Sequence, residues 1–196
     1  MAPVYADHPY DLIPTPTFQA SQTEKEAVEP DMFSRVASQM ALVHNMVIRG
    51  LNSIYLQAPH VSAPESKAFL QYTLAWYSLV DVHHSGEEAN FFPAVEGMTG
   101  QKGLMECNVA QHQEFHDGLA SFKVFIDACI SGTEDFDGAR AVTLIDGFGK
   151  SLTSHLRDEI STLMELRTFG MEKMGALEKV FGEEGESNMV SRPVWI

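Results

Sequence analysis

The sequence predicts an all-α protein, built as an antiparallel up-down four-helix bundle with an extended N-terminal arm. Two observations carry this prediction. No proline occurs between Pro93 and Pro193, so long helices are permitted across that span. Apolar residues also recur at helical spacings, and the first helix shows this in Phe33, Val36, Met40, Val47, Leu51 and Ile54. No strand-like alternation of useful length competes with this pattern, and long helices with short connections pack as an antiparallel bundle.

The helices are expected in chain order with recognisable ends. Asp31 is a suitable N-cap for the first helix, and Pro64 suits the first turn of the second. Pro93 is expected to end or kink the second helix. Ser131-Gly132 is a stop signal for the third. The expected helices span about residues 31–58, 64–92, 104–130 and 136–167, and a short fifth helix fits residues 172–181.

Proline also marks the N-terminal segment. Five of the nine prolines fall in the first 30 residues, so residues 1–30 are expected to form an extended arm. Residues 31–182 then form the bundle, and residues 183–196 form a tail whose apolar end, Val194-Trp195-Ile196, can pack back on the body. The side chains expected to strap the arm along the bundle are Tyr5, Tyr10, Leu12, Ile13 and Phe18.

Composition limits the class of protein. The chain has 196 residues, enough for one domain with a full core. Its net charge of −14 argues against nucleic acid and against an anionic membrane surface as partners. Its apolar runs are too short to span a membrane, and its first residues do not resemble a signal peptide. Only Cys107 and Cys129 are present, without a CxxC motif, which fits a cytoplasmic location.

Each expected helix carries a histidine within its apolar stripe. Residues four apart lie on one helix face about one turn apart, so two such side chains can converge on one metal or reach two adjacent metals. The first helix offers a single histidine, and the other three offer pairs at this spacing. These residues are His44; His83 or His84 with Glu87 or Glu88; His112 and His116; and His155 with Glu159.

The combination favours a metal site over a structural explanation. A single core histidine such as His44 is usually just hydrogen-bonded, and a pair such as His155 and Glu159 usually lies on the surface. Five histidines and two glutamates facing inward from four helices would each cost roughly several kcal/mol if left unpaired. Imidazole with carboxylate suits iron, manganese or zinc, and the lack of thiolates argues against an iron–sulfur cluster. Two metals that share both glutamates, one with three histidines and one with two, would use the whole set.

The doublets "HH" and "EE" in the second helix require a choice. His83 and Glu87 are predicted to be the ligands because they share a helix face with apolar Trp76, Val80 and Ala94. His84 and Glu88 share theirs with the more polar Tyr77 and Asp81, so we expect them beside the ligands or at the rim.

Another class of di-iron bundle is excluded by spacing. Ferritin-like proteins place a glutamate three residues before a histidine on two helices. None of the eight histidines here has a glutamate at that position, and Asp81 before His84 is the nearest approach.

The set of motifs resembles the hemerythrin-like family, also called the HHE cation-binding domain, over about residues 31–167. Its pattern is a histidine on the first helix, H-x-x-x-E on the second, one or two histidines on the third and H-x-x-x-E/D on the fourth. The matching segments here are His44, "HHSGE", "HQEFH" and "HLRDE", and the family's "EE…FP" is found as "EEANFFP".

The resemblance implies a non-haem centre of two iron ions, with manganese or zinc as substitutes, in a left-handed four-helix bundle. One iron would be held by three histidines and the other by two, with two bridging carboxylates. The iron with two histidines would have the open position, where O2 or a related small oxidant binds. The implied ligands are His112, His116 and His155 for one ion, His44 and His83 for the other, and Glu87 and Glu159 as bridges.

Two features bear on the reaction. Glu159 lies four residues after His155, whereas oxygen-carrying hemerythrins have an aspartate at the fifth position. This favours an oxidase or oxygenase that acts on a small organic substrate. The alternative is a non-enzymatic protein for O2 or NO binding, sensing or iron handling. The glycines at 86, 147 and 149 are compatible with close helix packing or with a cavity beside the metals.

Overall fold

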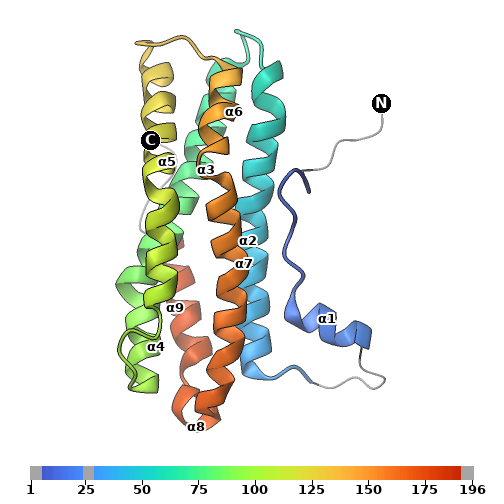
Figure 1. Ribbon diagram of the computed structural model, residues 1–196, viewed down its shortest axis with the longest axis vertical. Coiled ribbons are helices and arrows are strands. Elements are labelled where there is room, and N and C mark those ends of the chain that lie inside the picture. Colours follow the sequence, from blue (N-terminus) through green and yellow to red (C-terminus); the bar gives the residue numbers. More distant parts are fainter. Residues whose placement is uncertain (1–5, 24–28, 191–196) are drawn as a thin grey trace.

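The computed structural model describes residues 6–23 and 29–190, and every regular element within these ranges is helical, which confirms the all-α prediction (Figure 1). The helices are α1 (Pro16–Thr23), α2 (Met32–Gln57), α3 (Ser66–Gly86), α4 (Phe92–Thr99), α5 (Glu106–Ser131), α6 (Gly138–Asp146), α7 (Gly149–Glu165), α8 (Met171–Met174) and α9 (Leu177–Val190). Three short helical turns join some of them: η1 (Ala58–His60), η2 (Glu87–Phe91) and η3 (Leu166–Phe169).

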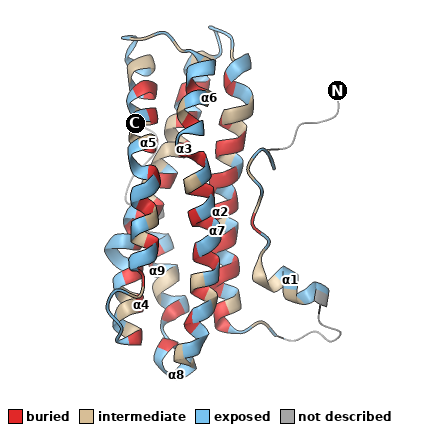
Figure 2. Ribbon diagram, viewed as in Figure 1, coloured by how far each residue is buried: buried red, intermediate tan, exposed pale blue. Residues whose placement is uncertain are grey.

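Four long helices lie side by side and enclose the core. Helix α2 packs against α3 and α7, and α5 packs against the same two helices. Helix α6 continues the line of α7 (Figure 1). The buried residues lie along the faces that these helices turn toward one another, and the outer faces are exposed (Figure 2). The core therefore runs along the length of the molecule, and each of the four long helices has one face on it.

The predicted ends of two helices are confirmed. The Asp31 carboxylate accepts a hydrogen bond of 2.7 Å from the backbone N–H of Ser34, so Asp31 is the N-cap of α2. Gly132 ends α5 in the left-handed region with φ of 73°, where a side chain would be strained.

The second helix does not end at Phe92 but continues through a wide turn. In η2 the backbone N–H of Phe92 donates to the carbonyl of Glu87, five residues back instead of four, and α4 then runs to Thr99. Pro93 is compatible with this winding, because proline has no N–H to donate and its ring crowds the carbonyl four residues before it. Turns of this kind are frequent at functional sites.

The fourth expected helix is divided at Gly147-Phe148 into α6 and α7. Phe148 is buried at this break, and its ring stacks on Trp76 with 6.4 Å between ring centroids. A side chain at Gly118 of α5 would overlap Phe148, and one at Gly149 would overlap the Tyr10 hydroxyl. These two glycines permit close packing. Gly86 is buried within α3.

The N-terminal arm is only partly extended, because residues 16–23 form α1, with Pro16 at its first position, where a missing N–H does no harm. Two asparagines of α2 hold the arm. Asn45 exchanges hydrogen bonds of 2.8 and 2.9 Å with the backbone of Ile13, and Asn52 bonds the backbone of Tyr10 in both directions. Ile13 is buried, whereas Phe18, expected as a strap, is exposed. Tyr5 lies outside the described residues.

The C-terminal part forms more helix than the expected residues 172–181. Helices α8 and α9 replace the single short helix, and α9 extends to Val190, well into the segment expected as a tail. Helix α9 lies against α2, α3 and η2. Val194, Trp195 and Ile196 lie outside the described residues. No described helix combines the length and the apolar character that a membrane span requires.

Candidate metal centre

Five buried histidines and two buried glutamates meet in the middle of the core. All seven side chains are almost completely buried, and the carboxyl groups of both glutamates are fully so. They come from all four long helices and from the wide turn after α3. The residues are His44 of α2, His83 and His84 of α3, Glu87 of η2, His112 of α5, and His155 and Glu159 of α7.

His116 is not among them, and the expectation that it faces the core is wrong. Its side chain is 67% exposed and pairs with Asp117 on the surface. The buried stripe of α5 passes from His112 to Phe115 and then to Leu119. Phe115, three residues after His112, faces the core, and His116, four residues after it, lies outside. Either spacing would allow a residue to share the helix face of His112.

His84 was expected either beside the ligands or at the rim, and the structure buries it inside the cluster. Helix α3 packs between α2 and α5, so two adjacent residues, about 100° apart on the helix, can each face one neighbour. His83 approaches His44 of α2, with 5.1 Å between ring centroids. His84 approaches His112 of α5 at 4.6 Å and His155 at 5.3 Å.

The nitrogen atoms form two groups. In the first, Nε2 of His44 lies 3.1 Å from Nε2 of His83. In the second, Nε2 of His112 lies 3.0 Å from Nε2 of His155. The second group also takes in His84, because one ligand atom each of His84, Glu87, His112 and His155 lie within 4.8 Å of one another. The same limit holds for His44, His83 and Glu87, so Glu87 belongs to both groups.

Each glutamate spans the two groups. Oε1 of Glu87 lies 3.2 Å from Nε2 of His83, and its Oε2 lies 3.7 Å from Nε2 of His112. Oε2 of Glu159 lies 3.4 Å from Nε2 of His44 and 3.8 Å from Nε2 of His155. Both carboxylates are therefore placed to bridge two cations, one in each group.

In four of the five histidine rings, a hydrogen bond at Nδ1 determines which of the two ring nitrogens carries the proton. A carbonyl or carboxylate oxygen only accepts, so Nδ1 carries the proton in each ring and Nε2 is left as a free lone pair. The acceptors are the Leu156 carbonyl for His44 (2.7 Å), the Val80 carbonyl for His84 (2.9 Å), the Glu88 carboxylate for His112 (2.7 Å) and the Gln111 side-chain oxygen for His155 (3.2 Å).

The consequence is clearest between His112 and His155. Their Nε2 atoms lie 3.0 Å apart, yet neither has a proton to share, because both protons are on Nδ1. Two facing lone pairs repel each other unless a cation lies close to both.

Burial governs the electrostatics of the centre. It lowers the pKa of His83, His84 and His155 well below the ordinary value, and the neighbouring histidines lower it further. Burial also raises the pKa of Glu87, with the charge of Glu159 adding to the effect. These three rings are therefore neutral, as metal ligation requires, and no nearby positive charge among the described residues compensates the Glu87 carboxylate.

The donors that remain unsatisfied fit two metal ions. Within the described residues, Nε2 of His84 and all four carboxylate oxygens of Glu87 and Glu159 have no hydrogen-bond partner. Such atoms cost about 1–3 kcal/mol each when buried, and more when charged. Nitrogen and oxygen donors without sulfur suit iron, manganese or zinc. The two groups contain three and two histidines, and His84 stands where the sequence analysis had placed His116.

The residues that orient the rings were partly missed. Glu88 was expected beside the ligands, and its carboxylate accepts from His112. Gln111 was not identified, because its contact with His155 joins α5 to α7 and leaves no trace in local spacing. In the sequence, the doublets "HH" and "EE" were the features that pointed to His84 and Glu88 as residues of the site.

Comparison with known proteins agrees with this architecture. Residues 35–166 match the family described as the hemerythrin HHE cation binding domain. This match covers more than half of the chain and includes all seven residues of the cluster, so the chain belongs to that family. Membership and the buried cluster together point to metal binding.

One curated relative is the dimeric xanthone biosynthesis cluster protein R11 of Cryptosporiopsis sp. (strain 8999). It is 32% identical over 172 residues, which cover 87% of this chain and 65% of the relative. The chain thus spans less than two thirds of that relative's length. No solved structure matches.

Proposed function

We propose that the chain holds two iron ions in an antiparallel up-down four-helix bundle formed by α2, α3, α5 and α6–α7. His44 and His83 bind one ion, His84, His112 and His155 bind the other, and Glu87 and Glu159 bridge them. The observation that carries this proposal is the convergence of buried nitrogen and oxygen donors, five of which have no hydrogen-bond partner in the part of the chain that the structure describes.

Two bound iron ions would supply a binding site for O2 and the electrons to reduce it. The chain's own residues prepare that site. The acceptors at Nδ1 hold four rings in one orientation, and the Glu88 carboxylate makes the His112 ring a stronger base. The side chains of the cluster are buried, which limits their contact with bulk water. The ion between His44 and His83 would have one protein ligand fewer, so the open position belongs there.

We favour an oxidase or oxygenase that acts on a small organic molecule over a carrier or sensor. The His155–Glu159 spacing differs from that of the oxygen carriers, as noted above. The relative is named for a biosynthesis cluster, which supports an enzymatic role for this chain.

The reaction with O2 tests this choice. Iron-loaded protein is reduced without air and then mixed with O2, and its absorption spectrum is followed. We expect rapid oxidation that is not reversed when O2 is removed. A stable oxygenated spectrum that disappears on deoxygenation would contradict the enzymatic proposal and favour the carrier.

Metal content tests the site itself. After expression with ample iron, metal analysis should find about two iron ions per chain, since two ligand groups are present. A content clearly below two would contradict the di-iron assignment, and a full complement of another metal would contradict iron.

A further inference from the structure

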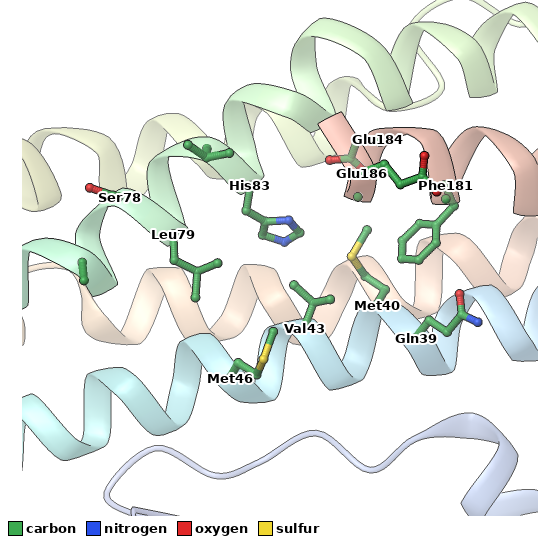
Figure 3. A pocket seen from close by; sticks show the side chains of 14 residues that line it. Gln39, Met40, Val43, Met46, Ser78, Leu79, His83, Phe181, Glu184 and Glu186 are labelled. Atoms are coloured by element: carbon green, nitrogen blue, oxygen red, sulfur yellow. The ribbon is translucent and has the colours of Figure 1, made fainter. Parts of the chain in front are cut away.

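A cavity of about 520 Å³ lies between α2, α3 and α9 and reaches the metal centre at His83 (Figure 3). Drug-sized ligands bind in cavities of roughly 300–1,000 Å³. O2 alone does not require such a volume. The wall is mostly apolar, and its larger side chains are Met40, Val43, Met46, Leu79, Val82 and Phe181.

The cavity meets the centre on the side with fewer ligands. His83 belongs to the group of two histidines, and Figure 3 shows its ring projecting from α3 toward Met40 and Val43 of α2. Met40 lies one helical turn before His44, the second histidine of that group. A molecule in the cavity would therefore lie next to the metal position that is expected to be open.

Helix α9 closes the cavity and leaves space in it. Gly182 and Gly185 line it, and a methyl group added at either glycine would meet nothing within 4 Å. Glycine weakens a helix by about 1 kcal/mol relative to alanine. Helix α9 also lies outside residues 35–166, so this wall is an addition to the part of the chain that matches the family.

The charges in the wall select against anions. Among the described residues that line the cavity, none is lysine or arginine, while Glu184 and Glu186 lie together on α9 (Figure 3). An anionic ligand would lose its hydration without gaining a lysine or arginine partner from this wall, and it would lie near two carboxylates. A hydroxyl or amine donor could instead bond to a carboxylate. Met40, Met46 and Phe181 favour an aromatic ring, through sulfur–aromatic and ring–ring contacts.

We propose that this cavity binds the organic substrate, a neutral and largely apolar aromatic molecule whose hydroxyl or amine groups lie near Glu184 and Glu186 and whose apolar body packs against Met40, Met46 and Leu79. The proposal rests on the proposed function for the reaction, but binding itself can be tested separately.

Two fluorescent probes of one framework test the chemistry. N-phenyl-1-naphthylamine is neutral and aromatic, and 8-anilinonaphthalene-1-sulfonate adds a sulfonate to the same rings. Each is titrated into the full-length, iron-loaded protein. We expect one neutral probe per chain, bound at least about tenfold more tightly than the sulfonate. Equal or tighter binding of the sulfonate, or no saturable binding of the neutral probe, would overturn the proposal.

A substitution at Gly182 tests the location. Gly182→Leu adds a large side chain to the cavity wall. Gly97→Leu is the matched control, because Gly97 is an exposed helical glycine of α4 that does not line the cavity. We expect about tenfold or greater loss of neutral-probe affinity in Gly182→Leu alone, with iron content unchanged in both variants. Unchanged affinity in a folded Gly182→Leu protein would overturn the location.

A second pair of variants serves if Gly182→Leu fails to fold. Met46 and Leu42 are both exposed on α2, one turn apart, and only Met46 lines the cavity. Met46→Glu should weaken the neutral probe, and Leu42→Glu should not. Equal effects would overturn the proposal.

The two hypotheses fail in different ways. Protein that holds iron but does not bind the neutral probe refutes the cavity's role and leaves the metal site intact. If the protein binds the probe at this cavity but holds no iron, the proposed function is refuted and the cavity remains a binding site for aromatic molecules.

Discussion

His84 reaches the second group of ligands because its Nδ1 is anchored to its own helix. The hydrogen bond to the Val80 carbonyl points Nε2 toward His112 and His155 and leaves it without a partner among the described residues. His116 is exposed and pairs with Asp117 on the surface. The two residues thus differ in chemistry even though each is one of a pair of histidines.

Metal content of two alanine variants follows from this difference. His84→Ala should reduce iron from about two ions per chain to about one, because the second group loses a ligand, and His116→Ala should keep two. Metal analysis of both purified proteins provides the measurement. Full iron in His84→Ala, or loss in His116→Ala, would show that the assignment is reversed.

Glu88 offers a subtler test. Its carboxylate is partly exposed and bonds to Nδ1 of His112. Glu88→Ala should weaken metal affinity by about 10–100-fold, since partners of ligands orient the ring and raise its basicity, while the fold remains. Competition with a coloured chelator measures the affinity. Glu114→Ala, at an exposed glutamate of the same helix as His112, is the control and should change nothing. Equal affinities would mean that this contact does not act on the centre.

At the scale of elements, close approach between α5 and the break at Phe148 positions α7 and its ligands. Gly118→Ala would place a methyl group onto the Cβ of Phe148, so a backbone must shift. We expect destabilisation of about 1–3 kcal/mol. Gly97→Ala, with free space around it, should be neutral or stabilise by up to about 1 kcal/mol. Urea unfolding compares the two, and a Gly118→Ala protein as stable as the wild type would contradict this packing.

The elements also show what the sequence can and cannot predict. Helical spacing identified α2 and α5 and their ends, because caps and apolar stripes are local. Helical spacing could not decide whether Phe115 or His116 faces the core together with His112, since residues three and four apart both lie near one helix face. The rotation of α3 that buries both His83 and His84 depends on two neighbouring helices. The asparagine bonds that hold the arm, Asn45 to Ile13 for one, likewise exist only in the folded chain.

At the scale of the whole molecule, the metal centre joins all four long helices. Without metal, Nε2 of His84 and the four carboxylate oxygens of Glu87 and Glu159 lie in this core with no hydrogen-bond partner among the described residues. Ions that bind only the folded chain stabilise it by about 2.7 kcal/mol per site at a hundred times the dissociation constant. The unfolding of the molecule is therefore expected to depend on metal.

Chelation should make this dependence visible. Metal-free protein is expected to melt roughly 10–20 °C below the iron-loaded protein. This estimate assumes stabilisation by ions at two sites, and a change in Tm of about 2–4 °C per kcal/mol for a chain of this size. Calorimetry of both forms is the measurement. His155→Ala, which loses a ligand, should show a smaller difference. An identical Tm with and without metal would mean that the ions do not hold the helices together.

The wide turn at η2 has a consequence for how this chain aligns with its evolutionary relatives. Because the Phe92 N–H reaches back five residues to Glu87, the turn contains one residue more than an α-helix needs. A related chain with an unbroken helix here would carry one residue fewer between the glutamate of its second helix and the following proline. A single-residue gap of this kind between two homologues would indicate that one residue was inserted here during evolution. The wide turn accommodates the extra residue, so the ligands before it keep their positions.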